Sequence, residues 1–300
     1  MPKGIVFNVQ KGLYNVYSEG EITACKLRGK LYLKTEKQTN LIVVGDEVEF
    51  EKTFNKQGII VNILERKSKL SRKGAGKNKK HLEQLIASNI DSAILVNSVK
   101  NPSYKKNLID RYIIACKKGN IEPVLCFNKC DLIDSQDIQN DIEFYEKTGI
   151  KVFLTSTLNN IGIDLLSDYI KDKISVFTGS SGVGKSSLVN ALEKIEVAKT
   201  HNVSNSNYKG MHTTTSSQIY MLPNGAMIVD TPGMREFGIF GSTVDEIKEM
   251  YEDIEKYSKE CKFNSCTHTH EPECAVKEAL ENGFIDEQRL KNYLKLIQEI

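Results

Sequence analysis

The sequence lacks any apolar run that approaches the roughly twenty residues needed to cross a bilayer. Its beginning, Met1 to Gly4, also lacks the apolar core of a secretory signal. Hydrophobic residues make up 40% and charged residues 27% of the 300 residues, so the chain can bury a core. These features predict a soluble protein of two or three domains with no membrane partner.

The sequence also lacks the even set of cysteines that a disulfide framework needs. It has seven cysteines, and four of them are scattered. An odd, scattered set predicts buried thiols in a reducing compartment. Together with the nucleotide motifs below, this favours the cytoplasm. The scattered cysteines are Cys25, Cys116, Cys126 and Cys130.

Positive charge is concentrated near the start of the chain. Residues 1–80 contain 17 Lys and Arg against 8 Asp and Glu, so the net charge of +2 divides into +9 there and −7 in the rest. Much of the excess lies between Arg66 and Lys80, where Gly74 and Gly76 favour a flexible linker. Such clusters attract phosphate backbones, which predicts contact with nucleic acid; a solvated linker is the alternative.

The first 65 residues show short alternating or β-branched runs separated by polar turns. Such spacing predicts a small β-barrel, and with this charge the oligonucleotide-binding barrel (OB-fold) is favoured over an SH3-like barrel. The expected strands are 4–9, 13–17, 22–27, 31–35, 43–50 and 59–64.

After residue 89 the pattern changes to strands alternating with helices, which predicts an α/β domain with a parallel sheet. The expected strands are 92–96, 123–127, 152–154, 175–177 and 226–229. The expected helices are 106–117, 137–147, 164–171 and 186–193. Each motif described next lies just beyond the carboxyl end of a strand, where open α/β sheets bind ligands.

A phosphate-binding loop runs from Gly179 to Ser186 with the spacing Gly-x4-Gly-Lys-Ser. Its glycines let backbone amides turn toward a β-phosphate, and Lys185 can reach the β and γ oxygens. The Ser186 hydroxyl suits magnesium, and the following helix presents its positive end to the anion. The match directly follows an apolar strand, which makes the signal specific.

A base-recognition motif, Asn-Lys-Cys-Asp, occupies residues 128–131. The Asp131 carboxylate can accept hydrogen bonds from both N1 and N2 of guanine, a pair of donors that adenine does not offer. The Lys129 stem is expected to lie along the base plane, and Asn128 to bond N7 and tie neighbouring loops together. Ser156 takes the position of a second base-contacting loop, on a shorter match. This motif precedes the phosphate loop, the reverse of the usual order, which predicts a circularly permuted P-loop GTPase domain.

Two further segments concern hydrolysis. Asp230 to Gly233 follow a strand, so Asp230 can hold magnesium through water and the Gly233 amide can meet a γ-phosphate. Met234 stands where many GTPases carry a water-orienting Gln, which predicts slow unaided hydrolysis. The polar stretch 198–217 resembles a mobile first switch in which one threonine completes the magnesium shell and His212 is a hypothetical water-positioning group.

Near the end, three cysteines and a histidine lie within fourteen residues. Three thiolates and one imidazole suit tetrahedral zinc with no open position, which predicts a structural ion. The expected ligands are Cys261, Cys266, His268 and Cys274, with His270 as the competing fourth ligand. Helical segments at 244–260 and 287–300 flank this cluster.

These features together resemble the ribosome small-subunit-dependent GTPase A family, often called RsgA or YjeQ. The resemblance rests on the permuted order, the zinc spacing, the basic barrel, and the stretches Gly-Met-His-Thr-Thr-Thr (210–215) and Asp-Thr-Pro-Gly-Met-Arg-Glu-Phe (230–237). It implies a bacterial cytoplasmic GTPase that binds ribosomal RNA, acts late in small-subunit maturation and is stimulated by that subunit. It also implies Thr214 as the magnesium threonine. Potassium-dependent relatives carry Asn at Gly182, which argues against potassium activation here.

The predicted architecture is therefore multi-domain: an OB-fold barrel at 1–68, a basic linker at 69–85, the permuted GTPase domain at 86–240 and a helical zinc-binding domain at 241–300. The predicted partners of this expected monomer are GTP and GDP, the small subunit and its ribosomal RNA. The alternatives are a GTP-dependent RNA-binding protein with negligible turnover and, less favoured, an enzyme that phosphorylates a small molecule. The predicted GTP-binding residues are Asn128, Lys129, Cys130, Asp131, Ser156, Gly179, Ser180, Ser181, Gly182, Val183, Gly184, Lys185, Ser186 and Ser187.

Overall fold

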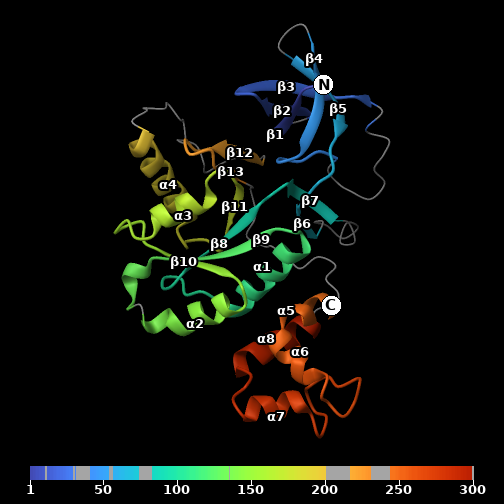
Figure 1. The fold of residues 1–300 in the computed structure, drawn as a ribbon, viewed down its shortest axis with the longest axis vertical. Coiled ribbons are helices and arrows are strands. Elements are labelled where there is room, and N and C mark those ends of the chain that lie inside the picture. Colours follow the sequence, from blue (N-terminus) through green and yellow to red (C-terminus); the bar gives the residue numbers. More distant parts are fainter. Residues whose placement is uncertain are drawn as a thin grey trace.

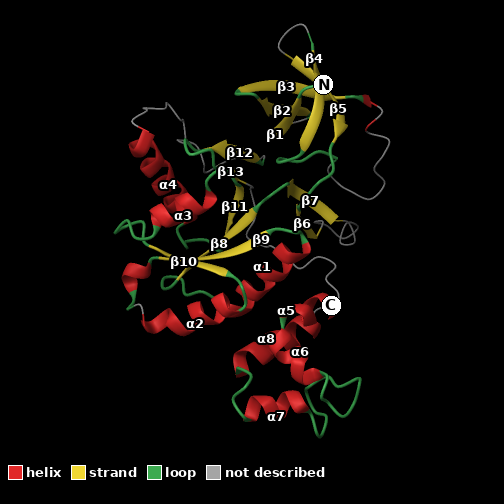
Figure 2. Cartoon of the chain, in the orientation of Figure 1, coloured by secondary structure: helices red, strands yellow, loops and turns green. Residues whose placement is uncertain are grey.

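The structure is a computed structural model that describes residues 1–10, 12–29, 31, 41–53, 57–73, 83–134, 136–200, 217–230 and 244–298. It has three parts: an N-terminal barrel, a central α/β domain and a C-terminal helical unit (Figure 1). Helices cover the central sheet, whereas the C-terminal unit consists of helices and loops alone (Figure 2). Within the described ranges, no helix combines the length and the apolar character that a membrane crossing requires.

The N-terminal barrel closes on itself. Its strands follow the order β1-β2-β3-β5-β4, and β4 pairs back with β1. The parallel pair of β3 and β5 breaks the simple meander, as the Greek-key OB-fold does. Inward-facing Val16, Val48, Phe50 and Ile60 are fully buried and form the core with Val6. The strands are β1 (Lys3–Gln10), β2 (Leu13–Ser18), β3 (Glu21–Leu27), β4 (Glu47–Lys52) and β5 (Gln57–Ile63).

Two expected barrel strands have different outcomes. The expected strand 43–50 begins only at Glu47. The Asp46 carboxylate accepts a hydrogen bond from the Val43 amide (2.9 Å), and the Asp46 amide bonds the Val43 carbonyl (3.3 Å). These bonds close a turn, so the chain is not extended there. The expected strand 31–35 lies outside the described residues except for Leu31.

The central sheet has the expected parallel strands, in the order β10-β9-β8-β11-β13. Residues of α1 and α2 pack with one face of the sheet, and residues of α3 and α4 pack with the other. The strands are β8 (Ser92–Ser98), β9 (Glu122–Asn128), β10 (Lys151–Thr155), β11 (Ile174–Thr178) and β13 (Met227–Asp230). The helices are α1 (Lys106–Lys118), α2 (Gln136–Lys147), α3 (Ile163–Ile170) and α4 (Lys185–Thr200).

A short strand, β12 (Gln218–Met221), joins this sheet to the barrel. It pairs antiparallel with β13 on one side and meets β1 at Asn8 and Gln218 on the other. The described strands of both parts thereby form one 11-stranded sheet.

The basic stretch expected to be a linker contains two strands, β6 (Lys69–Lys73) and β7 (Glu83–Ser88), which pair antiparallel. Leu70, Leu85 and Ala87 are buried in the cluster that includes the central sheet. Leu85 and Ala87 alternate along β7, so both lie on the strand face that is turned to the core. The predicted domain boundaries themselves stay a prediction.

The C-terminal unit packs its helices around a small core that includes Ile247, Tyr251 and Leu296. Ile114 of α1 belongs to the same cluster, so this unit lies against the central domain. The expected helical segment 244–260 is divided at Tyr251 into two helices. The helices are α5 (Val244–Met250), α6 (Glu252–Ser258), α7 (Ala275–Glu281) and α8 (Glu287–Gln298).

Candidate nucleotide site and metal centre

The phosphate loop connects β11 with the start of α4. Its Lys185 ammonium donates to the carbonyls of Gly179 and Ser180, both at 2.7 Å, so the ammonium lies over the loop. Gly184 has a φ of +97°, and a Cβ there would lie 2.3 Å from Nδ2 of Asn128. Only glycine lets the loop approach this side chain so closely. Buried Val183 anchors the loop in the core under α4.

The base-recognition motif contacts the phosphate loop directly. Asn128 ends β9 and is only 1% exposed. Its Nδ2 donates to the Val183 carbonyl at 2.9 Å, across 55 residues of sequence. Lys129 has a φ of 61°, and its ammonium donates to the carbonyls of Gly182 (2.8 Å) and Asn101 (2.5 Å). The two motifs are therefore in direct contact, although they occur in reversed order along the sequence.

Asp131 is positioned by the loop after β10. The Ser156 hydroxyl donates to Oδ1 of Asp131 and accepts from the Asn159 amide at 3.1 Å. The neighbouring Thr155 hydroxyl donates to Oδ1 of Asn128 at 3.1 Å. Ser156 and Thr155 are both fully buried, so these two side chains fix the direction of Asn128 and Asp131. A carboxylate held by one donor keeps lone pairs for two donors of a base.

The other predicted residues of the site are placed as follows. Asp230 ends β13, beside the β11 strand that leads into the phosphate loop. Ser186 and Ser187 lie in the first turn of α4, and Ser180, Ser181 and Gly182 are exposed on the loop. His212, Thr214 and Gly233 lie outside the described residues. Their roles stay predictions.

The scattered cysteines are buried or partly buried. Burial raises the pKa of the Cys25 thiol to about 11 and that of Cys116 and Cys126 to about 12. Burial, with the nearby Asp131 charge, also raises the pKa of Cys130. Neutral thiols are poor nucleophiles. These four thiols are therefore not expected to act as nucleophiles.

A cluster of four ligand-type side chains lies in the C-terminal unit. The ligand atoms of Cys261, Cys266, His268 and Cys274 all lie within 4.8 Å of one another and can hold a metal ion. Nδ1 of His268 lies 3.6 Å from Sγ of Cys261 and 3.5 Å from Sγ of Cys274. Burial lowers the pKa of His268, which favours the neutral imidazole that binds metals. His270 is exposed, and its Nδ1 lies 2.9 Å from the Thr269 hydroxyl.

Sequence reasoning missed the contribution of Asn101, whose carbonyl accepts from Lys129 and connects the loop after β8 to the site. The Pro102 ring also lies 3.6 Å from the position of a Cβ on Gly182. An Asn-Pro pair shortly after a strand marks a turn, and this signal was present in the sequence.

A parallel sheet with a phosphate loop and a guanine-type base loop in reversed order defines a circularly permuted GTPase. Residues 63–240 match the model of the family described as "RsgA GTPase", and residues 3–60 match the one described as "RsgA N-terminal domain". The chain belongs to the RsgA GTPase family.

Individual relatives agree along the whole chain. The protein named "Small ribosomal subunit biogenesis GTPase RsgA" from Flavobacterium psychrophilum is 38% identical over 98% of this chain and 92% of its own. The protein of the same name from Chlorobaculum parvum is 36% identical over 99% of this chain and 97% of its own. The crystal structure of YjeQ from Thermotoga maritima matches with a TM-score of 0.76 and 35% identity, over 99% of this chain and 98% of its own. The crystal structure of YloQ, described as a circularly permuted GTPase, matches with a TM-score of 0.69 and 31% identity, over 100% of this chain and 95% of its own.

Proposed function

We propose that this protein hydrolyses GTP to GDP and phosphate as a late maturation factor of the small ribosomal subunit. The observation that carries the proposal is the direct contact of the two nucleotide motifs through Asn128 and Val183 (2.9 Å). Relatives whose printed name is small ribosomal subunit biogenesis GTPase support the choice of partner. The protein acts in this role as a cytoplasmic monomer that binds the subunit and its ribosomal RNA and is stimulated by it.

Guanine is selected by Asp131. Its carboxylate accepts from N1 and N2 of the base, while Ser156 holds it in place. Adenine would leave this carboxylate without those donors, at a cost of several kcal/mol, so discrimination is strong. Lys185 and the loop amides bind the phosphates, and Asn128 keeps the two loops together.

Magnesium supplies charge neutralisation at the γ-phosphate when it is bound with GTP. Ser186 and Asp230 are the described residues that would hold it, Ser186 directly and Asp230 through water. In this proposal Thr214 would supply a further ligand, and the Gly233 amide would donate to the γ-phosphate. His212 positions the attacking water, because Met234 has no group that can orient it.

The four side chains of the cluster in the C-terminal unit would hold one structural zinc ion. Tetrahedral zinc, with Zn–S of about 2.3 Å and Zn–N of about 2.0 Å, separates two sulfurs by about 3.8 Å and sulfur from nitrogen by about 3.5 Å. The Cys261 and Cys274 sulfurs lie 3.8 Å apart, and His268 Nδ1 lies 3.5 Å from Cys274. Four protein ligands would fill the coordination shell, so the ion would support the fold and would leave no open position for catalysis.

Nucleotide state reaches the flanking units through short connections. β12 joins the barrel to β13, which ends at Asp230, and α5 begins 14 residues after Asp230. We infer that GTP favours the conformation that grips the subunit and that hydrolysis permits release. Equal binding of the GTP and GDP forms to small subunits would contradict this timing role.

A second candidate is a GTP-dependent RNA-binding protein with negligible turnover, which Met234 favours. One experiment separates the candidates: GTP hydrolysis by the full chain is measured with and without purified small ribosomal subunits. The proposal expects slow hydrolysis alone and a marked rise with subunits. Binding of GTP without a rise would favour the second candidate.

The nucleotide preference has its own test. Asp131→Asn is expected to abolish the preference for guanine over adenine nucleotides in equilibrium binding. Asp134→Asn, an exposed carboxylate in the same loop, is the matched control and is expected to keep it. An unchanged preference in the Asp131 variant would overturn the assignment.

A further inference from the structure

The turn after α1 lies against the base of the β6–β7 hairpin. The Lys69 amide donates to the Gly119 carbonyl at 2.9 Å, and Nδ2 of Asn120 donates to the Lys67 carbonyl at 2.8 Å. A Cβ on Gly119 would lie 2.3 Å from the Lys69 carbonyl oxygen, so the two backbones are in direct contact. The loop before β6 and the end of α1 therefore form one surface, although about 50 residues of sequence separate them.

Four lysines flank this contact: Lys67 and Lys69 from the hairpin side, and Lys117 and Lys118 from the last turn of α1. All four are exposed. We call them the hairpin–helix basic surface. Lys67 lies 3.2 Å from Glu47, but its side chain is 78% exposed, and exposed pairs of this kind are weak. Glu122, which follows the turn, lies 3.8 Å from Lys173.

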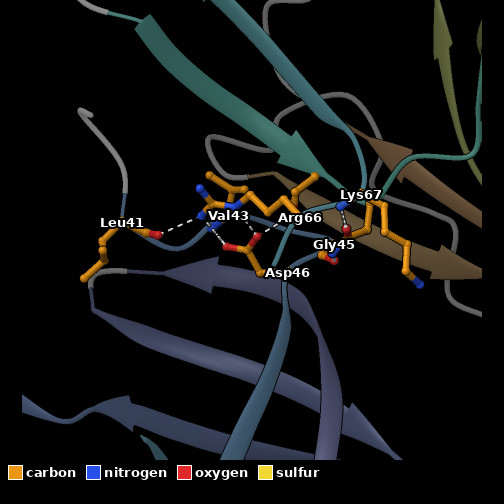
Figure 3. A network of polar contacts seen from close by, with 8 residues as sticks. Leu41, Val43, Gly45, Asp46, Arg66 and Lys67 are labelled. Atoms are coloured by element: carbon orange, nitrogen blue, oxygen red, sulfur yellow. Dashed lines mark hydrogen bonds and ion pairs between the residues drawn. The ribbon is translucent and has the colours of Figure 1, made fainter. Parts of the chain in front are cut away.

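The surface lies between the two flanking units. In Figure 1 the hairpin and the end of α1 stand between the barrel above and the helical unit below. The hairpin is fixed to the barrel by the Arg66 and Asp46 pair at 2.6 Å (Figure 3). On the other side, Ile114 of α1 packs in the core of the C-terminal unit. The contact between the hairpin and the end of α1 therefore lies between the two flanking units.

We propose that the hairpin–helix basic surface binds backbone phosphates of RNA and thereby extends the RNA-binding face from the barrel toward the C-terminal unit. This rests on the proposed function, because the RNA is that of the small subunit. Lysine ammonium groups are point charges that neutralise phosphates without reading bases. The surface therefore supplies affinity and orientation, not sequence specificity. The α1 lysines belong to it only because of the fold, since the sequence places them in the middle of the GTPase domain.

The test is the double variant Lys117→Gln and Lys118→Gln, compared with the wild type for binding to purified small-subunit RNA over a series of salt concentrations. Each lost phosphate contact lowers the slope of log affinity against log salt by about 0.7 to 0.9, so two contacts lower it by about 1.4 to 1.8. Weaker binding at every RNA sequence tested is expected as well. Lys117→Arg with Lys118→Arg is expected to retain the wild-type slope, because the charge is kept.

The matched control is Lys147→Gln with Lys171→Gln. Both residues are exposed, both lie at the ends of helices of the same domain, and the change in net charge is the same. The control is expected to keep the wild-type slope. GTP hydrolysis without RNA is expected to be equal in all variants, because none of these lysines touches the nucleotide site, and this shows that each variant is folded.

The outcomes separate the two proposals. If the wild type is stimulated by small subunits but the Lys117 and Lys118 variant binds RNA like the control, the basic surface is wrong and the proposed function stands. If the variant loses affinity for whole subunits but not for protein-free RNA, the surface contacts an acidic protein and the inference is overturned. If the wild type neither binds nor responds to subunits, the proposed function itself fails.

Discussion

The barrel and the C-terminal unit are both attached to the GTPase domain through a buried aspartate, but the two aspartates differ in how their charge is balanced. Asp46 at the barrel junction is fully buried and lies directly against a cation: Arg66 donates from Nε (2.6 Å) and Nη2 (2.8 Å) to its two oxygens (Figure 3). The Ser88 hydroxyl (2.5 Å) and the Val43 amide (2.9 Å) complete its shell. Arg66, Ser88 and Val43 together bond both oxygens of this carboxylate.

Asp110 at the C-terminal junction is 3% exposed, and the donors bonded to it among the described residues are neutral. One oxygen, Oδ2, accepts from the Tyr251 hydroxyl (2.9 Å) and from Nδ2 of Asn292 (3.0 Å). The nearby Arg289 donates instead to Asp253, at 2.5 and 2.8 Å, and lies over the rings of Phe144 and Tyr251. Burial accordingly raises the pKa of Asp110, although Arg289 opposes the rise.

At the barrel junction, the aspartate is bonded directly to an arginine. At the C-terminal junction, the charge of the aspartate is only partly compensated by a nearby arginine. The barrel is also joined by backbone pairing, through Asn8 and Gln218 and through the bridge between Val44 and Ala87. We therefore expect replacement of the aspartate to destabilise the barrel junction more than the C-terminal junction.

Removal of the proposed metal is expected to produce the largest difference in stability between the two junctions. The cysteines of the proposed zinc site pack with the core of the C-terminal unit, and structural zinc contributes roughly 10 kcal/mol or more to small domains. Chelation is expected to unfold this unit alone. Hydrogen exchange would show it: the amides of Tyr251 and Ile254 lose protection, while those of Val43 and Ser88 at the barrel junction keep it. Equal loss at both places would mean that the junctions are not independent.

Asp46→Ala is expected to have the largest effect of any single substitution at the junctions. It leaves the Arg66 guanidinium, 19% exposed, without its carboxylate, and breaking a buried pair costs about 3–5 kcal/mol. The free energy of unfolding from denaturant titration measures the loss. Lys67→Ala, which breaks the exposed pair with Glu47, is the control and is expected to cost less than about 1 kcal/mol. Similar losses in both variants would contradict the matched-pair interpretation.

How far the sequence predicts these features depends on how local their signals are. The phosphate loop and the base motif are each contiguous, so the sequence alone identifies residues 179–187 and 128–131. Their contact follows from the rule that parallel strands bring their carboxyl ends to one edge. The metal cluster is also local, because its four members lie between Cys261 and Cys274.

The junctions have no such local signal. Asp46 stands among turn residues and Arg66 among other cations, and nothing in the sequence pairs them across 20 positions. β12 has four residues, too few for a period to be seen, and its partner β1 is 210 positions away. Asp110 lies within a helix that also carries surface charges, and its burial depends on a unit that begins at residue 244. Pairing of this kind is decided by the tertiary fold.

Replacing Asp110 sharpens the contrast in charge. Asp110→Ala leaves the Tyr251 and Asn292 donors without an acceptor and is expected to cost about 1–3 kcal/mol. Asp110→Asn can present its carbonyl oxygen to both donors and removes the partly compensated charge. It is therefore expected to be as stable as the wild type at neutral pH, or more stable. Denaturant titration of both variants measures this order.

The contribution of Asp110 to stability changes with pH in a definite direction. Because the folded-state pKa of Asp110 lies above its ordinary value of 3.8, the folded protein binds this proton more tightly than the unfolded chain does. The contribution of Asp110 to stability is therefore greatest at low pH and falls as pH rises through the interval between the two values. The advantage of Asp110→Asn over the wild type is expected to grow with pH over the same interval. An advantage that shrinks with rising pH would show that the carboxylate is stabilised by Arg289 after all.

The smallest expected effect concerns the side chains where the barrel meets β12. Nδ2 of Asn8 donates to Oε1 of Gln218 at 3.4 Å, a long bond, and Oδ1 of Asn8 is buried without a hydrogen-bond partner among the described residues. Gln218→Ala is expected to cost under about 1 kcal/mol, and a double-mutant cycle with Asn8→Ala to give a coupling energy of similar size. A coupling above about 2 kcal/mol would make this contact, rather than the Asp46 pair, the main attachment of the barrel. A small coupling would mean that the barrel is connected to Asp230 mainly through the backbone hydrogen bonds between β12 and β13. Side-chain substitutions do not remove those bonds.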